Sequence, residues 1–295
     1  KNVGLFISMN SAGANNATEA IRIALFEQFA DRYFPAANAA APVELPSAKE
    51  HARMLAGNYI SSRGSFTNFV DVLNLAGQVK ISLDKDGRPS VPEILGGPPH
   101  KWIEVAPFVW QAAYGHARLG AVVENGRVVR WSFNPVSPFM VWERAPWYRD
   151  AAWLSPLFVA SLVLVLLTAL SWPVGAISRR RFGAAMSLSG PDLKTYRWVR
   201  GFSWLVLAVL SGWAALFMSL GADTIIGGAI LWPLQIAGAV GFVGLCGTAL
   251  WNLQRVWRSN RGWFAKLWSV LLVLAALVTL WVTLSFHLIS FGARY

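Results

Sequence analysis

Apolar positions are distributed differently in the two halves of this chain. From residue 151 onward, four long apolar runs occupy about 152–177, 201–221, 228–251 and 267–290. A hydrocarbon core of about 30 Å is crossed by about 20 helical residues, so each run is long enough to span a membrane. No polar face recurs within the runs, as it would in a water-soluble amphipathic bundle. The pattern predicts a four-helix α-helical transmembrane domain over 151–295.

The first half of the chain has shorter apolar runs and more of the dipeptides that form turns. Residues 51–149 contain strand-like segments separated by Asp86-Gly87 and Asn125-Gly126. These dipeptides favour tight turns between antiparallel strands. They predict a small antiparallel β domain, barrel-like or sandwich-like, that leads into the first span. Residues 35–50 are rich in Pro and Ala and are interpreted as a linker.

The segment before the linker predicts one strand and one helix. The strand covers 1–9, and the helix covers 17–34 with Ile21, Leu25 and Phe29 on one stripe. One strand and one helix cannot enclose a core of their own. We therefore expect 1–34 to be the C-terminal strand and helix of a larger α/β domain, which makes the fold class mixed.

Composition and charge agree with a membrane protein. Hydrophobic residues make up 55% of the 295 residues and charged residues only 14%, whereas soluble globular proteins have about 25% charged residues. The net charge of +11 is concentrated in the apolar half, because 1–150 hold 15 basic and 13 acidic residues while 151–295 hold 11 and 2. This distribution predicts a lipid bilayer as partner and no nucleic acid. With one cysteine, Cys246, the chain forms no intrachain disulfide and no cysteine-rich zinc module.

The loops between the spans predict an orientation. Six basic residues lie in 178–200 and four in 252–266, whereas the short loop near 222–227 has none and the C-terminus has only Arg294. The positive-inside rule places the two basic loops in the cytoplasm. An even number of spans then puts the N-terminal half and the C-terminus on the extracytoplasmic side, in a bacterium outside the inner membrane.

Two features inside the spans invite separate interpretation. Gly238, Gly241, Gly244 and Gly247 recur every three residues and predict a shallow ridge that a neighbouring helix can approach. His287 is the one strongly titratable side chain well inside a predicted span, and no span holds a carboxylate to partner it. A packed or interfacial histidine is the preferred interpretation, with a proton relay as the alternative.

Four segments together resemble a known family: VGLFISMNSAG, FADRYFP, HARMLAGNYISSR and ERAPWYRDA. They are similar to the C-terminal part of β-lactamase-related serine hydrolases, the group of class C β-lactamases and penicillin-binding-protein-like enzymes. The resemblance covers 1 to about 150. It implies a late strand of the catalytic sheet, a final helix on that sheet, an added β domain and a membrane tail. It also implies that Asn10, which follows GLFISM, borders the substrate pocket; the alternative is an asparagine chosen for its turn.

The chemistry of that family needs a serine with a lysine one helical turn later, a Tyr-x-Asn loop and a Lys-Thr-Gly or His-x-Gly strand. Ser82 and Lys85 have the spacing but run into the turn at Asp86-Gly87, where the two side chains share no helical face. Lys194-Thr195-Tyr196 lacks the glycine, and Tyr-x-Asn is absent. His51, His100 and His116 have no metal-ligand spacing. We therefore expect no catalytic residue, cofactor or metal in this chain.

Two functions remain open at this stage. In the first, the chain is the membrane-anchoring part of an extracytoplasmic serine hydrolase that acts on an ester, a D-amino peptide or a β-lactam, and an upstream domain of the same protein carries the catalytic serine, lysine and tyrosine. In the second, the chain is a non-enzymatic envelope membrane protein whose β domain binds a partner or ligand.

Overall fold

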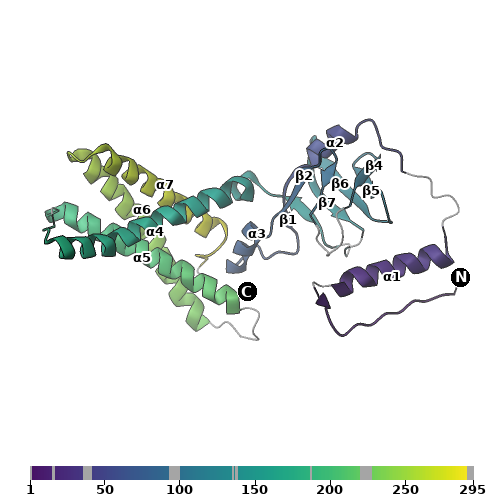
Figure 1. Ribbon diagram of the computed structural model, residues 1–295, viewed down its shortest axis with the longest axis horizontal. Coiled ribbons are helices and arrows are strands. Elements are labelled where there is room, and N and C mark those ends of the chain that lie inside the picture. The colour runs from purple at the N-terminus through teal and green to yellow at the C-terminus, as the bar shows by residue number, and fades with distance from the viewer. Residues whose placement is uncertain are drawn as a thin grey trace. The chain divides into compact units, whose positions relative to one another are not determined.

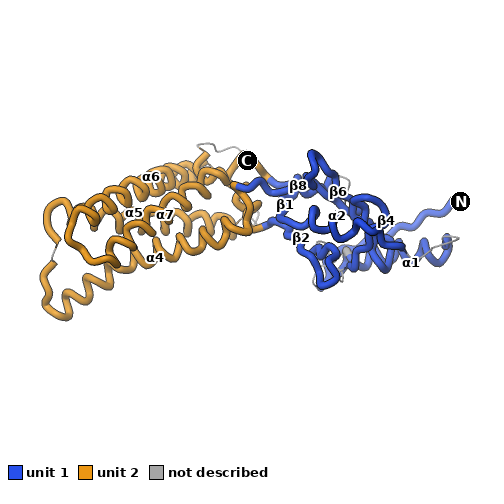
Figure 2. Tube along the Cα trace, turned by 90° about the horizontal axis from the view of Figure 1, so that it is seen from above, with its two compact units in different colours: residues 1–64, 77–147 blue, residues 65–76, 148–295 orange. Residues whose placement is uncertain are grey.

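The computed structural model describes residues 2–14, 17–35, 42–92, 100–134, 136, 139–186, 188–219 and 228–290. The chain divides into two compact units, coloured in Figure 2. Unit 1 comprises 1–64 and 77–147, and unit 2 comprises 65–76 and 148–295. The chain therefore enters unit 2 twice, first with a short segment between two strands of unit 1 and then with its long C-terminal part.

Unit 1 is built around one antiparallel sheet of eight strands, visible in Figure 1. Their order is β3-β2-β1-β8-β7-β6-β5-β4, so the first strand along the chain pairs with the last. The strands are β1 (Gly57–Ser61), β2 (Val79–Leu83), β3 (Pro89–Ser90), β4 (Trp102–Ala106), β5 (Val109–Ala112), β6 (Arg118–Glu124), β7 (Arg127–Phe133) and β8 (Trp142–Arg144). The predicted small β domain is confirmed in this near-barrel form.

One core fills the curved sheet. Its largest side chains, Trp110, Trp131 and Tyr59, are fully buried, and the Trp131 ring stacks on Trp142 at 4.7 Å between centroids. Helix α2 (Ala48–Leu55) contributes Leu55 to the same core. Because α2 begins at Ala48, the predicted linker ends a little earlier than residue 50.

Both predicted hairpin turns are present. Asn125 and Gly126 connect β6 to β7 with φ of 51° and 74°, the two positive values of a type I′ turn. Gly87, with φ of 81°, closes the turn between β2 and β3. These residues tolerate the left-handed region that most others avoid.

The N-terminal segment differs from its prediction in one respect. Helix α1 (Ala17–Tyr33) forms, but residues 2–9 form no strand with any described residue. A strand is stable only when a neighbouring strand accepts and donates its backbone hydrogen bonds, and none of the eight strands does so here. The expected serine-hydrolase remnant is therefore not visible as a strand and helix on a sheet.

Unit 2 contains the four predicted spans as long helices: α4 (Ala151–Phe182), α5 (Gly190–Ser219), α6 (Gly228–Arg258) and α7 (Trp263–Ser285). All four are long and apolar enough to cross a membrane, and the chain has the architecture of a multi-pass membrane protein. Their shared core includes Val206, Phe242, Leu245, Leu272 and Ala276, all nearly inaccessible. Leucines and valines on the outer faces stay exposed, as expected where lipid replaces water.

The short segment of unit 2 between β1 and β2 is helical, which the sequence analysis did not predict. Residues 65–76 form the 3-10 helix η2 (Phe69–Val72) and one turn of α-helix, α3 (Leu73–Ala76). Phe69 packs on Trp213 and Phe217 of α5, with ring centroids 5.2 and 5.9 Å away. The segment that sequence reasoning assigned to the β domain is thus a cap on the helical unit, and we call it the cap segment.

A candidate functional site around Asp71

Asp71 is the only fully buried acid among the described residues of unit 2, and it is the centre of a charge cluster. Its Oδ1 accepts hydrogen bonds from Nη2 of Arg149 and from Nδ2 of Asn74, the latter at 2.8 Å. Its Oδ2 lies 2.8 Å from Nδ1 of His287. The side chains of Asp71, Arg149 and His287 are 0%, 12% and 37% exposed. We call these three residues the Asp71 cluster.

Local sequence fixes the position of Asp71. Asn68 caps η2 by accepting from the Val70 N–H at 3.0 Å, and Ser65 donates to the same Asn68 oxygen at 2.9 Å. Asn74 bonds the Ser65 carbonyl at 2.7 Å while it donates to Asp71. The cap segment is therefore braced by its own polar side chains before it meets the helices.

Arg149 reaches Asp71 from the chain just before α4. It ends the 3-10 helix η3 (Trp147–Arg149), and the next residue, Asp150, caps α4 by accepting from the Ala152 N–H at 2.9 Å. The Arg149 guanidinium also lies 4.5 Å from the ring centroid of Phe286. An arginine in this position supplies both a planar donor pair and a face that packs on an aromatic ring.

His287 reaches Asp71 from the turn that ends α7. The Leu288 N–H donates to the Thr283 carbonyl at 3.0 Å, and the His287 N–H donates to the Leu284 carbonyl at 3.4 Å. These two bonds define a Schellman motif. His287 occupies the left-handed position of that motif with φ of 56°, where glycine is usual. The predicted fourth span ran to 290, so the structure moves His287 out of the helix.

The cluster joins three separate parts of unit 2. A buried carboxylate without partners would be strongly unfavourable, and both oxygens of Asp71 are engaged. A carboxylate only accepts, so Nδ1 of His287 carries the proton in this bond. An Asp–His pair can orient an imidazole for base catalysis, but within the described ranges no serine, threonine or cysteine side chain bonds His287. The arrangement is suited to holding the cap segment against the two helix ends.

A second buried carboxylate lies in unit 1. Oε1 of Glu104 accepts from the Phe108 N–H at 2.8 Å and lies 2.6 Å from Nδ1 of His51. The other oxygen, Oε2, is buried without a hydrogen-bond partner among the described residues. The His51 ring stacks on Phe108, whose φ of 58° places it in the left-handed region at the turn between β4 and β5. This pair orders the turn, with no nucleophile bonded to His51 in the described part of the chain.

Arg144 connects strands and helix α2 of unit 1 through hydrogen bonds. Its guanidinium donates to the carbonyls of Val128 and Met54 at 2.7 and 2.6 Å and to the Tyr59 hydroxyl at 2.8 Å. Burial raises the pKa of Tyr59 to about 12, and the nearby Arg144 opposes that effect only in part. Tyr59 therefore stays a neutral phenol that donates to the Leu55 carbonyl at 2.6 Å.

The other predicted candidates are dispersed. Ser82 lies on β2 and Lys85 in the turn after it, both exposed, so they share no helical face, as expected. His116 pairs with Asp31 at 2.8 Å and His100 packs edge-on to Trp102. Lys194, Thr195 and Tyr196 lie in α5. Asn10 lies in an exposed bend, and its place at a substrate pocket stays a prediction.

Sequence reasoning missed the Asp71 cluster, although two local signals for its helix are present in the sequence. Asn68 followed by Asp71 is the Asn-x-x-acid spacing of a helix start, and apolar Phe69, Val72 and Leu73 follow a helical spacing. The sequence singles out His287 as a histidine for which no span holds a carboxylate partner. Its partner comes from outside the spans, more than 200 residues earlier in the chain.

Comparison with known proteins gives no identification. No protein-family model matches the chain, and no curated protein or solved structure is significantly similar to it.

Proposed function

We propose that this chain is the C-terminal, membrane-anchoring portion of an extracytoplasmic serine hydrolase of the β-lactamase-related group. One observation carries the proposal: the N-terminal segment presents large apolar side chains to solvent. Phe6 is 89% exposed, Val3 57% and Ile21 53%. Large apolar side chains exposed to this extent on one segment support a place where another protein surface packs.

The family resemblance says what that surface would be. In the β-lactamase-related group a late strand completes the catalytic sheet and a final helix covers it, and the corresponding segments here are residues 2–9 and α1 (Ala17–Tyr33). Leu25 and Phe26 on α1 remain 37% and 44% exposed, which fits a helix face intended for a sheet. In this proposal an upstream domain supplies the sheet, and Asn10 then lies at the edge of its substrate pocket.

Acyl transfer would occur in that upstream domain. The reaction needs a nucleophile and its base within about 3 Å, with oxyanion donors beside them. Ser82 and Lys85, the best-spaced pair in this chain, lie on a strand and in an exposed turn. The proposal assigns the serine, lysine and tyrosine of the chemistry to an upstream domain of the same protein.

The four helices would hold the enzyme at the membrane. The helix ends and short connections within 178–200 and 252–266 carry the basic residues that favour the cytoplasmic side. The Asp71 cluster would then lie at the extracytoplasmic end of the bundle. It ties the cap segment to α4 and to the end of α7, so the chain between β1 and β2 is held to the anchor.

The test compares the complete gene product with residues 1–295 expressed alone, both in membranes. Each is treated with a fluorophosphonate probe and a labelled penicillin, and adducts are located by peptide mass spectrometry. The proposal expects an adduct on a serine upstream of Lys1 and none on the 295-residue chain. Hydrogen exchange should be slower in α1 of the complete protein than in the short chain.

Two results would overturn it. Labelling of Ser82 in the short chain, abolished by Ser82→Ala and by Lys85→Ala, would place the chemistry in this chain. A complete gene product with neither adduct nor protection of α1 would favour the alternative, a non-enzymatic envelope protein whose β unit binds a partner.

A further inference from the structure

A cavity opens between the four helices near the end of unit 2 where α4 ends and α5 begins. Its volume is about 720 Å³, which is in the range of sites for small ligands. All four helices contribute to its wall, with Ser171 from α4, Arg200 from α5, Asn252 from α6 and Trp268 from α7. Arg261, in the turn before α7, completes one side.

Positive charge in this cavity is not balanced by the protein. Among the described residues that line it, Arg200 and Arg261 are charged and none is acidic. The nearest acid along α5, Asp192, is engaged with Arg255, whose Nε lies 2.7 Å from Oδ1 of Asp192. Charged groups in a membrane domain are costly unless they are paired, so two arginines facing a cavity favour an anion inside it.

Arg200 is held in place for such an anion. Its Nε donates to the Ser171 hydroxyl at 3.0 Å, its Nη1 donates to the Tyr196 carbonyl at 3.2 Å, and its guanidinium carbon lies 3.5 Å from the centroid of the Tyr196 ring. Nη2 makes no hydrogen bond to a described residue. A guanidinium fixed by stacking loses little freedom when it binds a phosphate oxygen.

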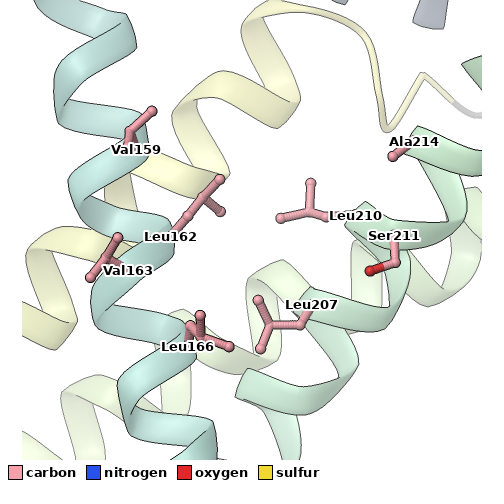
Figure 3. A pocket seen from close by; sticks show the side chains of 8 residues that line it. All are labelled: Val159, Leu162, Val163, Leu166, Leu207, Leu210, Ser211 and Ala214. Atoms are coloured by element: carbon pink, nitrogen blue, oxygen red, sulfur yellow. The ribbon is translucent and has the colours of Figure 1, made fainter.

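A separate apolar groove lies between α4 and α5. It has a volume of about 340 Å³ and is lined on α4 by Val159, Leu162, Val163 and Leu166, and on α5 by Leu207, Leu210, Ser211 and Ala214. Figure 3 shows the α4 and α5 side chains on opposite sides of this groove. Apart from the Ser211 hydroxyl, its wall presents only hydrocarbon.

Helical spacing places the cavity and the groove on one seam. On α4, Val163 of the groove is followed at four-residue intervals by Leu167 and Ser171 of the cavity. On α5, Arg200 of the cavity is followed seven residues later by Leu207 of the groove. Ten residues of helix from Arg200 to Leu210 rise about 15 Å, roughly half of a hydrocarbon core of about 30 Å. The cavity that holds the two arginines and the apolar groove therefore follow one another along α4 and α5, within about the length of a single lipid leaflet.

We propose that the seam between α4 and α5 binds one anionic phospholipid, with its phosphate on Arg200 and Arg261 and an acyl chain in the apolar groove. The site requires only that the four helices lie in a bilayer, so it stands apart from the proposed hydrolase function. A lipid with a net negative headgroup, such as phosphatidylglycerol, is preferred over a zwitterionic lipid, because none of the described residues that line the cavity is an acid that could pair with a choline or ethanolamine cation.

The full 295-residue chain in detergent is titrated with phosphatidylglycerol or phosphatidylcholine, and bound lipid is counted by native mass spectrometry. Arg200→Gln and Arg261→Gln should each weaken retention of phosphatidylglycerol by about tenfold or more, as expected for loss of a charge-assisted hydrogen bond. Arg197→Gln is the matched control, because Arg197 lies one turn away on α5, is exposed and does not line the cavity. Circular dichroism and thermal unfolding verify that each variant is folded.

A groove variant separates a lipid from a free anion. Ala214→Phe fills part of the groove far from the arginines, so it should weaken retention of phosphatidylglycerol and leave any binding of inorganic phosphate unchanged. Equal retention of the two lipids, or equal effects of Arg197→Gln and Arg200→Gln, would overturn the proposal. Tight binding of inorganic phosphate with no effect of Ala214→Phe on the lipid would replace it with a phosphate site.

Discussion

At the residue scale, Asp71 is the buried acid on which the stability of unit 2 is expected to depend, because it pairs with both Arg149 and His287. In Asp71→Asn the shape is kept, but the largely buried Arg149 loses the negative charge that Asp71 supplies, and the bond to His287 loses its charged acceptor. Removing one partner of a buried pair typically costs about 3 to 5 kcal/mol. We therefore expect a large drop in the thermal stability of the helical unit, measured by circular dichroism in detergent.

A surface acid gives the matched control for Asp71. Asp86 pairs with Arg88 in the turn between β2 and β3, and its side chain is 62% exposed. Exposed pairs contribute little because water and salt screen them, so Asp86→Asn should leave unfolding nearly unchanged. Equal stability of the two variants would show that the Asp71 cluster is not a clamp.

His287 allows a second test at this scale, because its backbone conformation favours glycine whereas its hydrogen bond requires the imidazole side chain. The left-handed φ of 56° favours glycine, while the bond to Asp71 needs the imidazole. Alanine has neither advantage, so His287→Ala should be less stable than His287→Gly by about 1 kcal/mol, the usual cost of a side chain in this conformation. Thermal unfolding of both variants beside the parent measures the order, and an alanine variant at least as stable as the glycine one would contradict it.

Single residues also show where sequence reasoning stops. His287 could be singled out as an ionisable group near the membrane, but its partner Asp71 is a contact between segments far apart in the chain. Periodicity describes what one segment buries and not which segment covers it. The same limit left Glu104 beside His51 unforeseen, since the two lie on different elements.

At the element scale, the glycine ridge of α6 decides how closely α5 approaches. A Cβ on Gly244 would lie 2.1 Å from a ring carbon of Phe202, whereas a Cβ on Gly247 would meet nothing within 4 Å. Gly244→Val should therefore lower the thermal stability of the bundle while Gly247→Val leaves it unchanged. Phe202→Ala combined with Gly244→Val should recover part of the loss, because it removes the atoms that clash. Equal effects of the two valine variants would mean that the helices are not packed through Gly244.

Three of the four predicted ridge positions do face α5, which explains why a three-residue spacing was informative. Gly238 and Gly241 lie near Val209 and Leu205, but Gly247 has turned away, since three residues fall short of a 3.6-residue turn. Hairpin turns and long apolar helices were equally predictable, because their signals are local. The cap segment was not, because its helical spacing covers little more than one turn and does not outweigh the strand-like residues around it.

At the scale of the whole molecule, the charge of the loops predicts how the chain crosses the membrane. Basic residues near span ends resist transfer across the bilayer, and ten of them lie in 178–200 and 252–266. Fusions of a fluorescent protein and of a periplasmic phosphatase after Gly190, Asn260 and Tyr295 measure the orientation in cells. We expect fluorescence without phosphatase activity after Gly190 and Asn260, and the reverse after Tyr295, since the two reporters work on opposite sides and control for each other. An active phosphatase after Asn260 would show that the chain has the opposite orientation. The arginines of the lipid cavity would then face the outer leaflet.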